Sequence, residues 1–81
     1  MTLLEQHEDK SFRVLVTLHN LAAVNEKSAI TVERLVEFMS VDRGPILIVL
    51  KSLSGEGLIS EIDEKYYLNY SGTLRILTNY T

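Results

Sequence analysis

One apolar segment in the middle of the chain is bounded at both ends by residues that begin or end helices. Gly44-Pro45 stands near its start, and Gly55-Glu56-Gly57 follows its end. Proline is tolerated in the first turn of a helix, where its missing N–H leaves no bond unmade, and glycine commonly ends a helix. The apolar residues that recur at helical spacing between these limits are Ile46, Leu50 and Leu53. The sequence therefore predicts a helix from Asp42 to about Leu53 with one buried side.

A longer apolar stripe predicts another helix near the start of the chain. Apolar residues recur over residues 12–24 in a stripe wide enough for a helix that is buried on most sides. Asp9 or Ser11 is the expected N-cap of this helix, because a short polar side chain can accept a hydrogen bond from the first free N–H groups. Residues 1–9, which include three acids, are expected to form a flexible lead-in.

A short helix is predicted between these two. Asn25-Glu26-Lys27-Ser28 interrupts the first stripe, and Ala29-Ile30 follows as a short apolar step with the character of a strand. Thr31 is a favourable N-cap, and Glu33 stands in the first turn, where the helix dipole stabilises an acid. The apolar positions that follow share one face, which predicts a helix over residues 32–39.

Two segments after the third predicted helix have the character of β-strands. Leu58–Ile62 and Lys65–Tyr70 are rich in β-branched and aromatic residues. Only Asp63-Glu64 separates them, which predicts a tight hairpin, although the absence of glycine from the turn leaves its type open. Ser71-Gly72 is expected to break the pattern, and residues 73–77 are expected to form a short last helix.

The composition is that of a small globular domain. The 81 residues are 46 % hydrophobic and 23 % charged, which fits one folded domain. The absence of cysteine excludes a disulfide scaffold and a cysteine-type zinc site. The five-residue apolar run Ile46–Leu50 is far short of the ~20 residues that a membrane-spanning helix needs, and the acidic start lacks the basic region of a signal peptide. We therefore expect a cytoplasmic protein with no membrane partner.

Patterns that carry catalysis or bind metals are missing from the sequence. His7 and His19 stand far apart without acids at ligand spacing, and no glycine-rich phosphate loop occurs. The acids gather at the start of the chain and at the predicted hairpin, rather than as a pair suited to general acid–base chemistry. We therefore expect neither an enzyme nor a bound cofactor or metal.

Residues 35–59 resemble the core of the winged helix-turn-helix family, whose apolar pattern continues without a gap from the second helix to the hairpin. The matching positions are Leu35, Met39, Val41, Ile46, Leu50, Leu53 and Gly57-Leu58-Ile59. Tyr66–Gly72 is similar to the closing strand and exit of the family's hairpin, or wing, so the resemblance covers about residues 11–77. It implies a single α+β domain over residues 1–81, with a three-helix core, a β-hairpin wing and a short C-terminal helix.

In DNA-binding members of this family, the outward side of the third helix enters the major groove. On a helical wheel, the buried side of this helix leaves Ile48 at the centre of the outward side, near Lys51 and Ser52. The residues expected to meet DNA are Arg43, Gly44, Leu47, Ile48, Lys51, Ser52 and Lys65. The resemblance thus implies a small transcription regulator that binds double-stranded DNA as a homodimer.

The charge pattern keeps a second function open. A net charge of −3 provides no general attraction to nucleic acid. The predicted wing has acids at Glu61, Asp63 and Glu64, where DNA-binding wings generally have Lys or Arg, and these acids would repel phosphates. The alternative is a winged-helix module that binds another protein through the apolar residues of its third helix, with little or no DNA binding. Its contact residues would be Leu47, Ile48 and Val49.

Apolar residues beyond the needs of one small core predict self-association. These residues are Leu47, Ile48, Val49, Leu74, Ile76 and Leu77. The segment Thr73–Leu77 also resembles the terminal helix through which many small winged-helix regulators dimerise. Since closed two-fold dimers are the commonest oligomers, we expect a homodimer.

Overall fold

Helices and short strands follow one another in nearly the order that the sequence predicts. The computed structural model describes the backbone of residues 3–79 and the side chains of residues 10–78. Its elements are α1 (Leu3–Asn20), the 3-10 turn η1 (Glu26–Ser28), β1 (Ile30–Thr31), α2 (Val32–Met39), α3 (Arg43–Gly55), β2 (Ile59–Ile62), β3 (Lys65–Leu68) and α4 (Tyr70–Asn79). The described residues therefore form an α+β fold of four α-helices and one three-stranded antiparallel sheet.

The turn between α2 and α3 is short and locally determined. The Arg34 N–H donates to Thr31 Oγ1 at 3.2 Å, which confirms the predicted cap of α2. Ser40 ends α2 in the left-handed region, with φ 56°, and its N–H donates to the Val36 carbonyl at 2.9 Å. Asp42, where the predicted third helix begins, occupies the N-cap position of α3, but its side chain makes no capping hydrogen bond. The carboxylate of Asp42 is therefore not engaged in holding the helix.

Gly57 turns the chain from α3 into the sheet. It has φ +77°, a conformation that costs other residues about 1 kcal/mol. The Gly57 N–H donates to the Ser54 carbonyl, and the Leu58 N–H donates to the Leu53 carbonyl, both at 3.0 Å. This pair of bonds is the Schellman arrangement, in which a left-handed residue satisfies the last free carbonyls of a helix. The predicted helix end is thus confirmed to within two residues.

The hairpin is as tight as predicted, and its strand order places β3 in the centre of the sheet. β2 pairs with β3 from Ile59 opposite Leu68 to Ile62 opposite Lys65, and β1 pairs with the other edge of β3. The two turn residues, Asp63 and Glu64, have φ values of 50° and 64°. Positive φ at both central residues is the signature of a type I′ turn, whose twist matches that of the flanking strands. The structure thereby supplies the turn type that the sequence left open.

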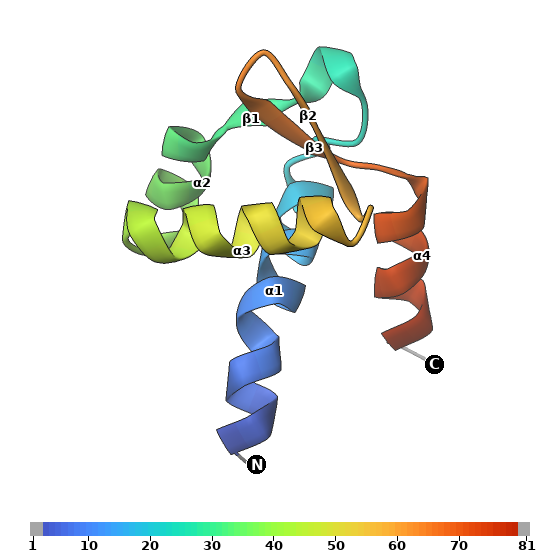
Figure 1. Ribbon diagram of the computed structural model, residues 1–81. Coiled ribbons are helices and arrows are strands. Elements are labelled where there is room, and N and C mark those ends of the chain that lie inside the picture. Colours follow the sequence, from blue (N-terminus) through green and yellow to red (C-terminus); the bar gives the residue numbers. More distant parts are fainter. Residues whose placement is uncertain (1–2, 80–81) are drawn as a thin grey trace.

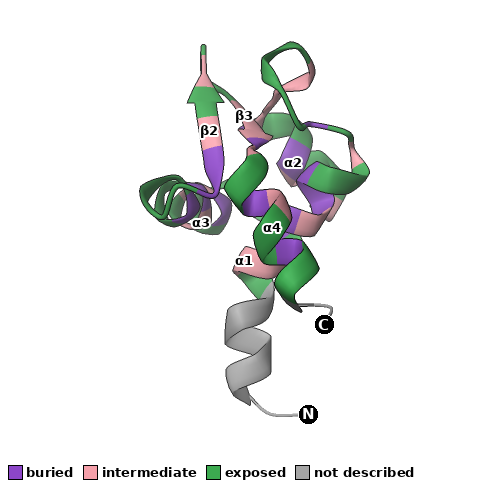
Figure 2. Cartoon of the chain, turned by 90° about the vertical axis from the view of Figure 1, so that its right-hand side faces the viewer, coloured by how far each residue is buried: buried purple, intermediate pink, exposed green. Residues whose placement is uncertain are grey.

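The core lies where α3 meets α1, α2 and the sheet (Figures 1 and 2). α3 crosses the molecule in front of α1, with α2 at one end and α4 beyond the other. The buried apolar residues are Val14, Leu15, Leu18, Ala23, Val32, Leu35, Ile46, Leu50, Leu53, Leu58, Ile59, Leu68 and Ile76. All three residues predicted for the buried side of the third helix belong to this cluster, so the predicted rotation of that helix is confirmed.

The two terminal helices differ from the sequence-based expectation. α1 begins at Leu3, so the N-cap predicted at Asp9 or Ser11 is wrong, and the predicted lead-in over residues 1–9 is helical from Leu3 on. Leu, Glu and Gln, which are good helix formers, make up most of its first turn. α4 begins at Tyr70 instead of residue 73, because Ser71-Gly72 continues the helix rather than breaking it.

Asn69 explains the early start of α4 and joins it to the end of α3. Its Oδ1 accepts from the Gly72 N–H at 3.0 Å, which caps the helix. Its Nδ2 donates to the Gly57 carbonyl at 2.9 Å and to Ser60 Oγ at 3.2 Å. One side chain therefore ties together the first turn of α4, the turn after α3 and strand β2.

We expect Asn69→Ala to lower the free energy of unfolding by about 2–3 kcal/mol, because the cap and two long-range bonds are lost together. Asn25→Ala is the matched control, since the Asn25 side chain accepts only from Ser28, three residues away, in exposed hydrogen bonds. That change should cost about 0.5–1 kcal/mol. Asn69→Asp keeps the acceptor, loses the amide donor and should fall between the two. Urea unfolding of the three variants measures the order, and equal losses for Asn69→Ala and Asn25→Ala would contradict the long-range role.

Candidate functional site

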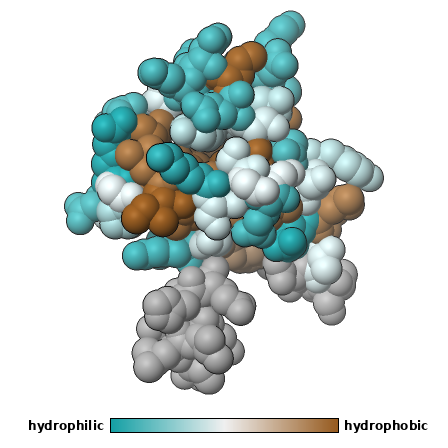
Figure 3. Space-filling model, viewed as in Figure 1, coloured by the Kyte–Doolittle hydropathy of each residue, from teal (hydrophilic) through white to brown (hydrophobic). Residues whose placement is uncertain are grey.

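The outward side of α3 is exposed from its first turn to its last. Gly44, Ile48, Lys51 and Ser52 are all exposed, and Ile48 keeps 72 % of its surface accessible. α3 lies in front of the other elements in Figure 1, and Figure 3 shows hydrophobic residues among hydrophilic ones on this face. The structure thus places four of the seven residues predicted to meet DNA together on one helix face.

Two flanking residues contribute less to this face than the sequence suggests. Leu47 and Val49 are half-buried and pack against the core cluster. Each lies beside the buried stripe of α3, so part of each side chain turns inward to the neighbouring elements. The apolar contact surface predicted over residues 47–49 is therefore centred on Ile48, with only the outer parts of its two neighbours.

Arg43 stands at the first position of α3 and is paired with an acid of α2. Its guanidinium lies 3.2 Å from the Glu33 carboxylate, and both side chains are more than half exposed. An exposed ion pair contributes only ~0–1 kcal/mol and can be exchanged for a stronger partner. The sequence did not predict this pair, because Glu33 and Arg43 are brought together only by the angle between α2 and α3.

The hairpin beside this end of α3 is acidic. Glu61, Asp63 and Glu64 are exposed on it, against the single cation Lys65. Burial raises the pKa of the Tyr66 hydroxyl above its ordinary value, and the nearby carboxylates of Glu61 and Glu64 raise it further.

The positive charge of Arg43 acts in the opposite direction and tends to lower the pKa of Tyr66. Burial and the two carboxylates outweigh it, so the pKa stays raised. The beginning of α3 and the hairpin therefore share one electrostatic environment, in which carboxylates outnumber cations. Lys65 lies on β3, opposite Thr31 and Ile62, rather than on the helix face with the other predicted contacts.

Lys51 is the cation that projects from the middle of the face. It is exposed, and no salt bridge joins it to another residue in the part of the chain that the structure describes. A phosphate that approaches the centre of α3 would meet Lys51 first. Arg43 could join it only by leaving Glu33.

The described residues form neither a metal-binding cluster nor a membrane-spanning helix. No group of three or more His, Asp or Glu side chains among them could hold a metal ion. None of the helices over residues 3–79 combines the length and hydropathy that crossing a bilayer requires.

Comparison with protein-family models, with curated proteins and with solved structures finds no match to this chain.

Proposed function

We propose that this chain is a winged helix-turn-helix protein that binds double-stranded DNA through the outward side of α3 and regulates transcription as a homodimer. The observation that carries the proposal is the exposure of α3 along its whole length, opposite a side fixed in the core by Ile46, Leu50 and Leu53. A rigid helix with one free side is what the major groove accepts. The antiparallel hairpin that follows α3 corresponds to the wing.

The residues on this face have distinct roles in the proposal. Lys51 meets a phosphate or a base edge, and the hydroxyl of Ser52 offers a further hydrogen bond. Gly44 leaves open space at the first turn of α3, where a phosphate backbone could approach the helix closely. Arg43 exchanges the Glu33 carboxylate for a phosphate. Since the acidic hairpin opposes these few cationic contacts, binding by one protomer is weak and falls as the salt concentration rises.

Dimerisation would double this small set of contacts. The surface that supports it is on α4, where Tyr70, Leu74 and Leu77 are exposed at helical spacing, with 78 %, 43 % and 57 % of their surface accessible. Ile76, predicted to be a surplus apolar residue, is only 7 % exposed and belongs to the core, so that part of the prediction is wrong. The remaining apolar stripe is narrower than expected and lies on one side of α4.

The proposal predicts a salt-dependent affinity that responds to Lys51. We expect mixed-sequence duplex DNA to bind in fluorescence anisotropy at low salt, with log K falling as log salt rises. Lys51→Ala should reduce that slope by about 0.9, the value for one lost phosphate contact, if Lys51 meets the backbone. Lys27→Ala, an exposed cation on η1, is the matched control and should change little. No binding by the wild type at low salt, or equal effects of the two variants, would overturn the DNA proposal.

A second candidate function follows from the exposure of Ile48. A large apolar side chain at the centre of the face, on a helix whose first cation is already paired with Glu33, suits contact with another protein better than contact with phosphates. In this case the partner would cover Ile48 together with the outer parts of Leu47 and Val49.

Ile48→Arg separates the two functions. On DNA, the new cation should tighten binding and steepen the salt slope by about 0.9, with the mass in sedimentation unchanged. In a protein contact, the same change buries an unpaired charge, so an assembly made through this face should dissociate while the fold persists. Tighter DNA binding at unchanged mass supports the first function, and loss of assembly without gain in DNA affinity supports the second.

A further inference from the structure

A hollow lies between α1 and the turn that joins α2 to α3. Its volume is about 290 Å³, and its lining residues are Lys10, Arg13, Met39, Ser40, Val41, Asp42, Pro45 and Ile46. Ligand sites typically begin at ~300 Å³, so the hollow accommodates a small molecule rather than a chain segment. It lies beside the buried side of α3, at Ile46, and is therefore separate from the face centred on Ile48.

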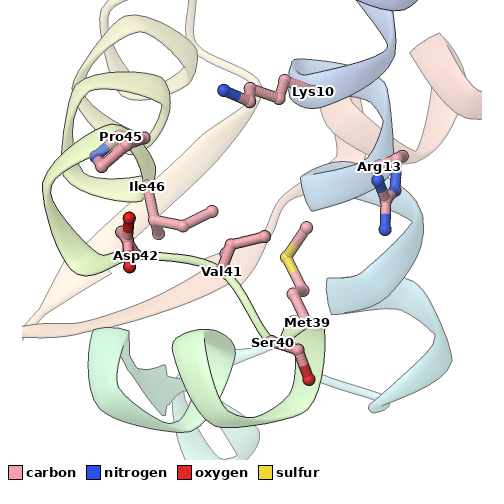
Figure 4. Close-up of a pocket in the computed structure, with 8 residues that line it drawn as sticks. All are labelled: Lys10, Arg13, Met39, Ser40, Val41, Asp42, Pro45 and Ile46. Atoms are coloured by element: carbon pink, nitrogen blue, oxygen red, sulfur yellow. The ribbon is translucent and has the colours of Figure 1, made fainter.

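The floor of the hollow is apolar. Figure 4 shows the side chains of Met39, Val41 and Ile46 directed toward one another between the three helices. Met39 and Val41 are only half-buried although both pack against the core, which leaves part of each facing the hollow. An unbranched thioether such as Met39 adapts its shape to an apolar occupant.

Two cations form the side of the hollow that belongs to α1. Lys10 and Arg13 are three residues apart, so they project from the same side of the helix. Figure 4 shows the Lys10 side chain extended from α1 toward α3, whereas the Arg13 side chain is directed along α1, away from the Lys10 ammonium. Both residues are exposed, and neither makes a salt bridge with another described residue.

The opposite side holds one carboxylate. Asp42 lines the hollow from the beginning of α3, and its side chain makes no capping hydrogen bond there. The lining thus has two positive charges and one negative charge over an apolar floor. An anionic group is favoured near α1, and Asp42 opposes it only from the far side.

From this arrangement we infer that the hollow is a binding site for a small organic carboxylate, whose apolar body lies on Met39, Val41 and Ile46. Its carboxylate lies on the α1 side of the hollow, where the Lys10 side chain reaches toward α3 and Arg13 adds a second positive charge. The ligand would contact α1 and the first turn of α3 at once, which distinguishes this site from the proposed DNA face. Among the lining residues, only Pro45 and Ile46 belong to α3, so the hollow can bind its ligand whether or not α3 enters DNA.

Benzoate is a suitable probe, with benzamide as its uncharged counterpart and acetate as a carboxylate without an apolar body. We expect benzoate to give saturable shifts of the Met39 methyl signal in NMR, with a dissociation constant in the millimolar range that is ordinary for so small a ligand. Benzamide and acetate should each bind more weakly, since each lacks one half of the complementary chemistry. Equal shifts by all three compounds, or shifts that never saturate, would overturn the site.

Charge variants test which residues hold the carboxylate. Lys10→Gln and Arg13→Gln should each weaken the binding of benzoate about two- to fivefold, which is the range for exposed ion pairs. The affinity for benzamide should stay unchanged. Lys27→Gln is the control cation and should have no effect. Asp42→Asn should increase the affinity for benzoate, because it removes the negative charge that opposes the carboxylate. Weaker benzoate binding by Asp42→Asn, or loss of binding with Lys27→Gln, would contradict the assignment.

Discussion

Replacing Leu50 by alanine is expected to lower the free energy of unfolding by about 3–5 kcal/mol. Leu50 has no accessible surface and lies in the core cluster where α3 meets the other elements. The substitution removes buried methyl groups and leaves a cavity, and burial this complete places the loss in the upper part of the usual range for Leu→Ala. Domains of this size have total stabilities of ~4–12 kcal/mol, so the variant should unfold well below the wild type in urea.

Lys51→Ala is the control for this prediction, since it changes the next residue of the same helix. Lys51 is exposed, and its replacement should alter the free energy of unfolding by less than about 0.5 kcal/mol. Because the two residues are neighbours in the same helix and both become alanine, the difference between the two stability losses reports the burial of Leu50 rather than a change in helix propensity. A larger loss for Lys51→Ala than for Leu50→Ala would show that α3 is rotated differently about its axis.

Gly72→Ala is expected to lower the free energy of unfolding by about 2–3 kcal/mol, although alanine is the better helix former. A Cβ on Gly72 would overlap the backbone carbonyl of Leu58 and the Leu68 Cδ1 atom. The Leu58 carbonyl accepts a hydrogen bond from the Asn69 N–H, so it cannot move without disturbing the start of α4. Forcing an extra methyl group into such a contact usually costs 1–3 kcal/mol, to which the displaced hydrogen bond adds.

Gly55→Ala is the control, and we expect it to leave the free energy of unfolding unchanged or to raise it. Gly55 is the last residue of α3, and nothing lies within 4 Å of the Cβ that alanine would add there. The substitution should leave the protein as stable as the wild type or stabilise it by about 0.5–1 kcal/mol, because alanine loses less backbone freedom on folding. Thermal or urea unfolding of both variants measures the difference, and a Gly72→Ala protein as stable as Gly55→Ala would contradict the close packing of α4 against Leu58.

The elements that the sequence predicted well are those with local physical causes. Thr31 caps α2 through a bond that spans three residues, and Gly57 ends α3 through bonds to the last turn of the same helix. Asp63-Glu64 allows only a two-residue turn between the strands that flank it. The exposed position of Ile48 also followed from the sequence, because the wheel of a helix is determined once its buried residues are known.

The misplaced start of α4 shows why some local rules fail. Ser71-Gly72 has the composition of a break, yet Asn69 caps a helix that runs through both residues. Glycine at position 72 reflects the closeness of Leu58 rather than a need for an unusual backbone angle. That distance depends on how α4 docks beside the sheet, which no short window of sequence contains.

The candidate sites divide in the same way between sequence and tertiary structure. The sequence by itself determined which residues of α3 point outward and that the hairpin beside them is acidic, because helical and strand periodicity act over a few neighbouring residues. Only the tertiary structure decided that Arg43 pairs with Glu33, and that Lys10 and Arg13 of α1 lie beside Met39 and Val41. Arg43 is ten residues from Glu33 along the chain, and Lys10 and Arg13 are at least 26 residues from Met39 and Val41. They meet because the helices pack at particular angles, and those angles arise from the shape of the whole core rather than from any local pattern.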